Sequence, residues 1–309
     1  MIMMPKVSVI IPNYNHSAFL VERIESVLNQ SYGDFEVIIL DDCSKDNSVE
    51  IIEKYRTHPK ISHIVFNQIN SGSTFQQWKK GIELAKGEWI WLAESDDVAE
   101  SSFLETFNVF LTKYPEFVLF FCASHYIDEF GTRTNKVTWA EDISERNWQN
   151  DFYANGIVEI QEQFFYKNII PNASAVIFKK EAVDKEVFEI ISNMKFSGDW
   201  FFWIKLLESG NMAYTSKVLN YFRNHRFTTR ALKSGKEEKK RYAEYFTVIR
   251  YIRDKYKLNW DVRKHDWILK EWCVRYKKIN KSKYLLYNPY FPFLYNWLFL
   301  KMMIREKIK

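Results

Sequence analysis

The 309-residue sequence contains no glycine-rich phosphate loop. Its first apolar run ends in Pro12-Asn13-Tyr14-Asn15-His16, where a dinucleotide-binding fold would carry Gly-x-Gly-x-x-Gly. A Gly-Lys-Ser/Thr triplet is also missing. These absences argue against a dinucleotide-dependent oxidoreductase and a P-loop enzyme. If this chain binds a diphosphate, a metal ion and basic side chains must hold it.

Cysteine is scarce, and Cys43, Cys122 and Cys273 lie far apart in the sequence. Their odd number and the lack of a Cys-x-x-Cys pair argue against a disulfide framework and a zinc site. Such cysteine usage, together with a start that lacks signal-peptide character, predicts a cytoplasmic protein.

Charge is distributed unevenly along the chain, although the formal net charge is only +5. Residues 1–225 carry a net charge of −10, whereas residues 226–309 carry +15. Within the basic part, residues 284–300 are uncharged and rich in aromatic side chains, but two prolines interrupt them. This run is too short and too broken for a membrane-spanning helix, which needs about 20 apolar residues.

Two interpretations of the basic, aromatic end remain open. It is either a helical appendage packed on the rest of the chain or a segment that binds an anionic membrane surface. No nucleic-acid recognition module is visible, so nucleic acid is not an expected partner.

Strand and helix patterns alternate through the first half of the chain. Apolar runs predict strands at 7–11, 35–40, 61–66, 89–93, 117–127 and 173–178. Helical spacing and capping signals predict helices at 17–29, 76–85, 102–114 and 199–208. The helix at 102–114 is expected to begin with a capping box between Ser102 and Glu105. Residues 131–165 are predicted to form mainly loops, and residues beyond 230 are predicted to be largely helical. The alternation predicts an α/β fold with a mainly parallel, doubly wound sheet.

Two acidic pairs follow predicted strands, at the edge where such sheets bind ligands. Asp41-Asp42 follows the strand at 35–40, and Asp96-Asp97 follows the strand at 89–93, with Glu94 beside it. Carboxylates there can accept hydrogen bonds from ribose hydroxyls or hold a divalent cation. Helix capping explains the second pair less well, because serines stand closer to the next helix. Adjacent like charges repel, and a bound cation would remove that cost.

Six sequence blocks occur in a fixed order: Val7–Asn15, Leu28–Tyr32, Phe35–Ser44, Asn70–Gly72, Lys86–Ile90 and Glu94–Asp97. In this order and spacing they resemble the family-2 glycosyltransferases with the GT-A fold. The resemblance covers residues 5–230. It implies a Rossmann-like GT-A domain over 1–230, with a nucleotide-binding half (1–100) and an acceptor half (101–230). Residues 231–309 would then form a helical, basic and aromatic extension.

The resemblance also implies roles for matched residues. Asp42 would recognise the nucleotide base with support from Asp41, and Asp97 would bind Mn²⁺ or Mg²⁺. Asp96 would lie toward the donor or share the metal. Further positions at the donor would be Pro12, Asn13, Tyr14, Asn15, Asn70 and Gly72.

A second set of matched residues lies further along the chain. Asp199, in Ser197-Gly198-Asp199-Trp200, would be the catalytic base, although it could also cap the following helix. Arg223 would offset the charge of the leaving diphosphate, and His225 would bind the cation or a phosphate. Asn172-Ala173-Ser174 would face the acceptor.

The expected activity is therefore inverting transfer of a sugar from a nucleotide-diphosphate donor, with a UDP-sugar favoured. The acceptor would be a saccharide or polyprenyl-linked saccharide in cell-surface polysaccharide synthesis. The protein would then act in the cytoplasm or at the inner face of the cell membrane. Two alternatives remain: a sugar nucleotidyltransferase, which should carry a glycine-rich loop, and a binding-only homologue. Glu94, where most relatives have aspartate, is the one hint of the second.

Overall fold

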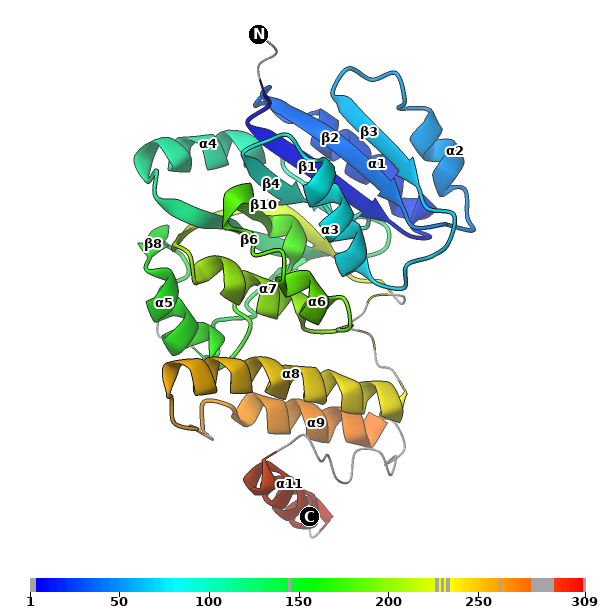
Figure 1. Ribbon diagram of the computed structural model, residues 1–309. Helices are drawn as coiled ribbons and strands as arrows, with labels where there is room; N and C mark the ends of the chain where they lie inside the picture. Colours follow the sequence, from blue (N-terminus) through cyan, green and yellow to red (C-terminus); the bar gives the residue numbers. More distant parts are fainter. Residues whose placement is uncertain are drawn as a thin grey trace.

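The computed structural model describes residues 4–143, 146–225, 228, 231, 234–261, 263–278 and 292–307 (Figure 1). One sheet runs through the body of the molecule in the order β3-β2-β1-β4-β9-β6-β10-β5, while β7 pairs with β6 and β8 with β10. Its strands are β1 (Val7–Asn13), β2 (Phe35–Asp41), β3 (Ile61–Phe66), β4 (Trp89–Leu92), β5 (Val98–Ala99), β6 (Phe117–Ile127), β7 (Arg133–Lys136), β8 (Phe152–Ala154), β9 (Val176–Lys179) and β10 (Asn211–Arg223).

Strands β3, β2, β1 and β4 are parallel to one another, and β10 is parallel to β6. Strand β9 joins the two groups and is antiparallel to both β4 and β6. Strands β1 and β2 are buried along their whole length, as expected for continuous apolar runs in the middle of a parallel sheet. The predicted α/β fold with a mainly parallel sheet is confirmed.

Helices cover both faces of this sheet. The helices in the first 210 residues are α1 (Ser17–Leu28), α2 (Ser48–Glu53), α3 (Thr74–Leu84), α4 (Phe103–Lys113), α5 (Gly156–Glu159), the π-helical η1 (Ile160–Phe164), the 3-10 turns η2 (Ala173–Ala175) and η3 (Lys180–Ala182), α6 (Val187–Ile191) and α7 (Gly198–Leu207). Buried residues of α1, α2 and α4 share one core with Val9 and Ile11. Those of α3, α6 and α7 share the other core with Ile10. Alternate residues of β1 therefore face opposite layers, which makes the sheet doubly wound.

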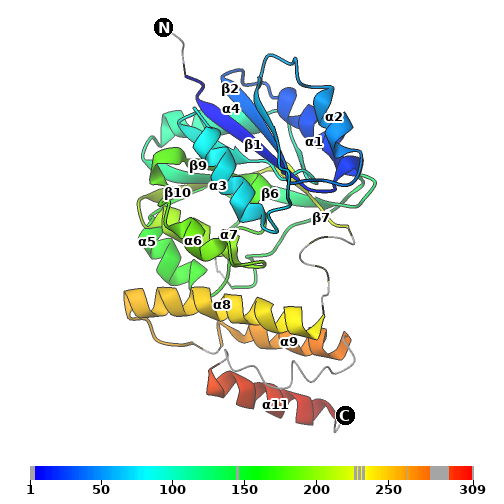
Figure 2. The ribbon, with the colours of Figure 1, turned by 45° about the vertical axis from the view of Figure 1, so that its right-hand side comes forward.

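The basic end of the chain adds a helical layer beneath α6 and α7 (Figures 1 and 2). It comprises α8 (Gly235–Tyr256), α9 (Asp266–Lys278) and α11 (Phe293–Lys307). Tyr242 and Phe246 of α8 belong to the same buried cluster as the body, and Trp272 of α9 stacks on Phe299 of α11 at 3.8 Å. The predicted helical extension is confirmed, and α8 and α9 share a core with the body. The aromatic run at 284–300 lies outside the described residues up to position 291.

Three local predictions differ from the structure. Helix α4 does start after Ser102, but the Ser102 side chain makes no capping bond. Gln30 Oε1 instead accepts the N–H of Leu104 (3.0 Å), because the turn that follows α1 brings a glutamine to that helix end. Residues 131–165 contain β7, β8, α5 and η1, and the strand predicted at 173–178 begins only at Val176, after η2.

Candidate active site

Asp97 connects the acidic loop after β4 to two other segments through hydrogen bonds. Its side chain is buried and accepts hydrogen bonds from Asn172 Nδ2 (2.9 Å) and Ser174 Oγ (2.7 Å). A third bond comes from the backbone N–H of Arg223 at the end of β10 (2.8 Å). The role of Asp97 as a metal ligand stays a prediction. These hydrogen bonds also give its carboxylate a structural role, because they hold the acidic loop against the two segments.

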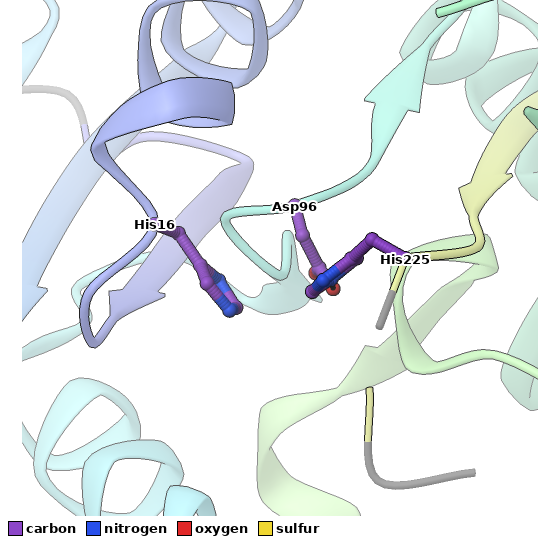
Figure 3. A group of neighbouring side chains, drawn as sticks. All are labelled: His16, Asp96 and His225. Atoms are coloured by element: carbon purple, nitrogen blue, oxygen red, sulfur yellow. Dashed lines mark hydrogen bonds and ion pairs between the residues drawn. The ribbon is translucent and has the colours of Figure 1, made fainter. Parts of the chain in front are cut away.

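Asp96 lies beside two imidazole rings. His225 Nε2 is 3.0 Å from Asp96 Oδ2, and His16 reaches the same place from the loop after β1. One ligand atom from each residue lies within 4.8 Å of the other two. Figure 3 shows the three side chains coming together from three separate loops. Two imidazoles and a carboxylate at this spacing could hold one divalent ion.

The three carboxyl groups of this loop have different pKa values. Burial, followed by the nearby charge of Asp96, raises the pKa of Glu94 to about 8 and that of Asp97 to about 6. Burial alone would also raise the pKa of Asp96. The hydrogen bond with His225 and the charges of both histidines outweigh it and lower that pKa to about 2. Asp96 is therefore the carboxylate of the loop that is ionised throughout the neutral range, as a metal ligand must be.

Arg23 of α1 places a positive charge behind the acidic loop. The side chain is fully buried, and its Nε donates to the backbone carbonyl of Glu94 (2.8 Å). Burial lowers the pKa of Arg23 to about 10, while the charges of Asp97, Asp96 and Glu94 oppose that shift. A buried cation beside these carboxyl groups reduces the repulsion among them.

Arg223, the last residue of β10, also holds the acidic loop in place. Its guanidinium is buried and donates to the backbone carbonyls of Asp96 (2.7 Å) and Asp128 (2.9 Å) and to the carboxylate of Glu22. The predicted contact of Arg223 with a diphosphate stays a prediction. The observed contacts make it a positioning residue for Asp96.

Asp42 organises the loop that carries Asn70 and Gly72. Asn70 Nδ2 donates to the backbone carbonyl of Asp42 (2.9 Å), and Asn70 Oδ1 accepts the N–H of Gly72 (2.8 Å). Gly72 has φ = +73°, a left-handed conformation that favours glycine. The buried carboxylate of Asp42 accepts hydrogen bonds at 2.7–2.9 Å from the side chains of Asn67, Ser71 and Gln77.

Asp41 and Asn15 join the loops that follow β1 and β2. Asp41 Oδ2 accepts hydrogen bonds from Asn13 Nδ2 (2.7 Å) and Ser44 Oγ (2.6 Å). Asn15 has φ = 55°, which asparagine tolerates better than most residues, and its Oδ1 accepts the N–H of Lys45 (2.7 Å). The two loops are thus locked side by side at the carboxyl edge of the sheet.

Asp199 stands in the first turn of α7. The helix begins at Gly198 with Ser197 as its N-cap, so the capping role considered for Asp199 is not observed. Its Oδ2 accepts a hydrogen bond from Asn168 Nδ2 (3.2 Å). Burial raises the pKa of Asp199 to about 6, although hydrogen bonds from the backbone and from Asn168 oppose the shift. A carboxylate with this pKa suits proton abstraction near neutral pH.

The segment that leads into α7 is held by helix α8. Glu244 of α8 is buried, and its carboxylate accepts the backbone N–H groups of Lys195 (2.9 Å), Phe196 (2.7 Å) and Ser197 (3.0 Å). A residue 45 positions further along the chain than Asp199 therefore helps to set the position of the turn that carries it.

A single cavity of about 560 Å³ connects these features. Asn15, Asp41 and Arg223 lie outside its lining and support it from behind. Other predicted residues line it: Pro12, Asn13, Tyr14, Asp42, Asn70, Gly72, Asp96, Asp97, Asn172, Asp199 and His225. The predicted donor, metal and base residues thus meet in one place.

Sequence reasoning did not single out several residues that line this cavity. His16 ends the run Pro12–His16, and its place at the carboxyl edge of β1 was a usable signal. Trp139 lies in a segment read as loop, while Tyr245 and Trp267 belong to helices with no matched motif. Their approach to the site depends on how the helices pack, which the sequence pattern does not reveal.

Comparison with known proteins gives the family. The profile described as Glycosyl transferase family 2 matches residues 8–170, more than half of the chain. The chain belongs to glycosyl transferase family 2. This family-2 glycosyltransferase is 38% identical over 100 residues to glycosyltransferase GlyG of Streptococcus pneumoniae, which is 32% of this chain and 33% of GlyG. It is 32% identical over 120 residues to the poly(ribitol-phosphate) beta-N-acetylglucosaminyltransferase TarS of Staphylococcus aureus, covering 38% of this chain and 20% of TarS. The matched regions thus span a third or less of these two relatives.

Solved structures show the same fold. The crystal structure of S. aureus TarS 1-349 in complex with UDP-GlcNAc has a TM-score of 0.59 and 19% identity, covering 88% of this chain and 73% of that one. The mannosyltransferase PcManGT from Pyrobaculum calidifontis, in complex with GDP-Man and Mn²⁺, has a TM-score of 0.52 and 12% identity, covering 96% and 87%. The GT-A fold expected for the glycosyltransferase is thereby shown. Among the described residues, no helix is long and apolar enough to cross a bilayer.

Proposed function

We propose that this glycosyltransferase moves a sugar from a nucleotide-diphosphate donor to a saccharide acceptor with inversion at the anomeric carbon. The observation that carries the proposal is a single cavity lined by Asp199 and by the His16–Asp96–His225 group. Asp199 would take the proton of the acceptor hydroxyl as its oxygen attacks the anomeric carbon and the nucleoside diphosphate leaves. One base acting in a single displacement inverts the configuration.

The donor would bind at the end of the cavity lined by Pro12, Asn13, Tyr14, Asn70 and Gly72. Asp42 would recognise the base, and Asp41 would support the loop. UDP is the favoured nucleotide, a choice supported by the TarS structures with UDP and UDP-GlcNAc. The names of these relatives further suggest a role in cell-surface polysaccharide synthesis.

We propose His16, Asp96 and His225 as ligands of a divalent ion, with Asp97 as a further candidate ligand. When bound, the ion would offset negative charge on the diphosphate. Imidazole ligands are unusual for Mg²⁺ and common for transition metals, so this set favours Mn²⁺ over Mg²⁺. Arg223 and Arg23 would keep Asp96 in place.

The decisive experiment is a donor panel of UDP-, dTDP- and GDP-sugars with Mn²⁺ or Mg²⁺, monitored by nucleotide release. We expect release from a UDP-sugar with Mn²⁺, and none once a chelator is added. The Asp199→Asn variant should bind UDP as tightly as the wild type but release no nucleotide. Full turnover by that variant would remove Asp199 as the base. Nucleotide binding without turnover in the wild type would favour a binding-only homologue.

A membrane surface is the proposed site of action. Four apolar side chains of α11 are exposed at a spacing of four, three and four residues: Phe293 (84%), Trp297 (48%), Leu300 (46%) and Ile304 (59%). This spacing places them in one stripe along the helix. Because residues 226–309 carry a net charge of +15, we propose that α11 docks on anionic lipid at the inner face of the cell membrane. A polyprenyl-linked saccharide would then be the acceptor.

We further propose that the chain is divided into residues 1–230, which carry out catalysis, and residues 231–309, which form the extension.

A further inference from the structure

Aromatic side chains extend from the neighbour of Asp199 across the part of the cavity closed by α8 and α9. Trp200 packs against Tyr245 of α8, with ring centroids 6.2 Å apart. Tyr245 packs against Trp267 of α9 at 5.4 Å, and Trp267 packs against Trp139 at 6.4 Å. All four rings line the same cavity as Asp199. We refer to Trp139, Trp200, Tyr245 and Trp267 as the aromatic wall.

Hydrogen bonds at the indole nitrogens fix the orientation of the wall. The N–H groups of Trp139, Trp200 and Trp267 donate to backbone carbonyls within residues 164–168, at 2.7–3.1 Å. The donor to Asp199, Asn168, belongs to the same short segment. Rings held in this way lose little freedom when a ligand stacks on them. The base and the wall are therefore parts of one ordered unit.

Charged groups beside the wall are paired with opposite charges. Arg241 Nε lies 3.0 Å from the carboxylate of Glu238, and Arg275 contacts Glu238 (3.2 Å) and Glu271 (2.8 Å). The ammonium of Lys167 lies over the rings of Trp139 (4.2 Å) and Trp267 (5.4 Å) and is paired with Asp142 at 2.8 Å. Cations and carboxylates therefore balance one another here. This balance favours an uncharged ligand that has apolar C–H faces for the rings and hydroxyls for the polar rim.

We propose that the aromatic wall is an acceptor subsite in which the partly exposed rings of Trp139, Tyr245 and Trp267 stack on an uncharged pyranose ring of the acceptor saccharide, with the buried Trp200 behind them. The proposal rests on the transferase function proposed above, because the wall leads to the predicted base. Tyr245 and Trp267 lie beyond residues 8–170, which match the family profile. The C-terminal helices would thus select the acceptor, whereas the first half of the chain binds the donor.

The test is saturation-transfer NMR with irradiation of the protein's aromatic protons. The probes are methyl β-glucoside, methyl β-galactoside and methyl β-N-acetylglucosaminide, each measured with the full chain in saturating UDP and Mg²⁺. We expect transfer to the ring protons of at least one glycoside. Trp267→Ala and Trp139→Ala should each raise its Kd on the order of tenfold, while Trp267→Phe should stay close to the wild type. Phe130→Ala is the control, since Phe130 is 85% exposed and does not line the cavity.

Two results would overturn the subsite: no transfer to any glycoside, or unchanged binding in both alanine variants. Thermal melting and UDP affinity of each variant show whether it is folded, and Trp267→Phe keeps the test valid if Trp267→Ala is not. Nucleotide release from the donor panel reports separately on the transferase function. Glycoside binding that depends on the wall, without any donor turnover, would reject the transferase and keep the saccharide subsite.

Discussion

At the scale of single residues, the protonation of Asp199 sets the expected pH dependence. Burial raises the pKa of this carboxyl group to about 6, and only the ionised form can accept a proton. We therefore expect kcat/KM to fall about tenfold per pH unit below pH 6 and to level off above it. A pH–rate profile with saturating metal checks this. A profile without an acidic limb near pH 6 would contradict the assignment.

The Asp199→Asn variant separates catalysis from folding. Activity should fall on the order of 10²- to 10⁴-fold, because the amide accepts no proton. A pKa raised in the folded state means that Asp199 favours folding most at low pH, and that this contribution is lost as the pH rises through about 6. The variant should accordingly melt no lower than the wild type at pH 8. A large drop in its melting temperature would show that the activity loss reflects unfolding.

Asp96 and Asp97 are adjacent in sequence but should respond differently to mutation. Asp96→Asn removes the carboxylate that lies beside His16 and His225, so we expect weaker Mn²⁺ binding. Asp97→Ala leaves three hydrogen-bond donors without their acceptor, which should lower the free energy of unfolding by roughly 1–3 kcal/mol. Paramagnetic resonance of free Mn²⁺ and urea unfolding measure the two effects. Loss of Mn²⁺ binding in Asp97→Ala at unchanged stability would instead support Asp97 as the ligand.

This contrast also shows how far the site could be predicted. The strand-end rule located Asp96-Asp97 and Asp41-Asp42, because the carboxyl ends of parallel strands meet at one edge. Which oxygen faces the cavity depends on Asn172, Ser174 and the backbone of Arg223, which lie 75 or more residues away in sequence. Periodicity carries no information about such distant partners.

At the scale of elements, Glu244 of α8 couples the extension to the turn before α7. Glu244→Ala would leave three backbone N–H groups of residues 195–197 without an acceptor, so we expect a loss of roughly 2–3 kcal/mol in the free energy of unfolding. The kcat should fall as Asp199 shifts, while UDP affinity should stay unchanged because the donor loops are separate. Urea unfolding and calorimetric UDP titration test both expectations.

Glu88→Ala is the matched control for Glu244→Ala. Glu88 makes an exposed ion pair with Lys6 at 2.7 Å, and pairs of this kind contribute about 0–1 kcal/mol. Equal destabilisation by both substitutions would mean that Glu244 does not specifically hold the turn.

The elements that were predicted well have strong periodic signals, and the missed ones do not. Strands β1, β2 and β4 are short apolar runs, whereas β10 spans 13 residues with polar positions and register shifts around Thr215 and Val218. Its pairing with β6 provides the regularity that its own sequence lacks. The predicted capping box is absent for a similar reason, because Gln30, just after α1, takes the place of Ser102.

At the scale of the whole molecule, the C-terminal layer has one face toward the active site and another toward solvent. Helices α8 and α9 share a core with the body, so deleting everything after residue 230 would expose that core and confuse folding with membrane binding. Substitutions in the exposed stripe of α11 avoid this problem. Phe293 and Trp297 are 84% and 48% exposed, so replacing both with serine should leave the melting temperature unchanged.

The same double variant tests membrane docking. Burial of two large apolar side chains and attraction of the basic extension to anionic lipid should both favour binding, so we expect the partition coefficient onto phosphatidylglycerol-containing vesicles to fall on the order of tenfold or more. Binding of the wild type should also weaken at about 0.5 M salt, because charges are then screened within a few ångströms.

The control is Phe130→Ser, which removes an aromatic side chain of similar exposure from the body and should partition like the wild type. Equal co-sedimentation of all three proteins would reject α11 as the membrane contact. If sedimentation velocity showed wild-type dimers that the double variant lacks, the stripe would instead bind a second copy of the chain.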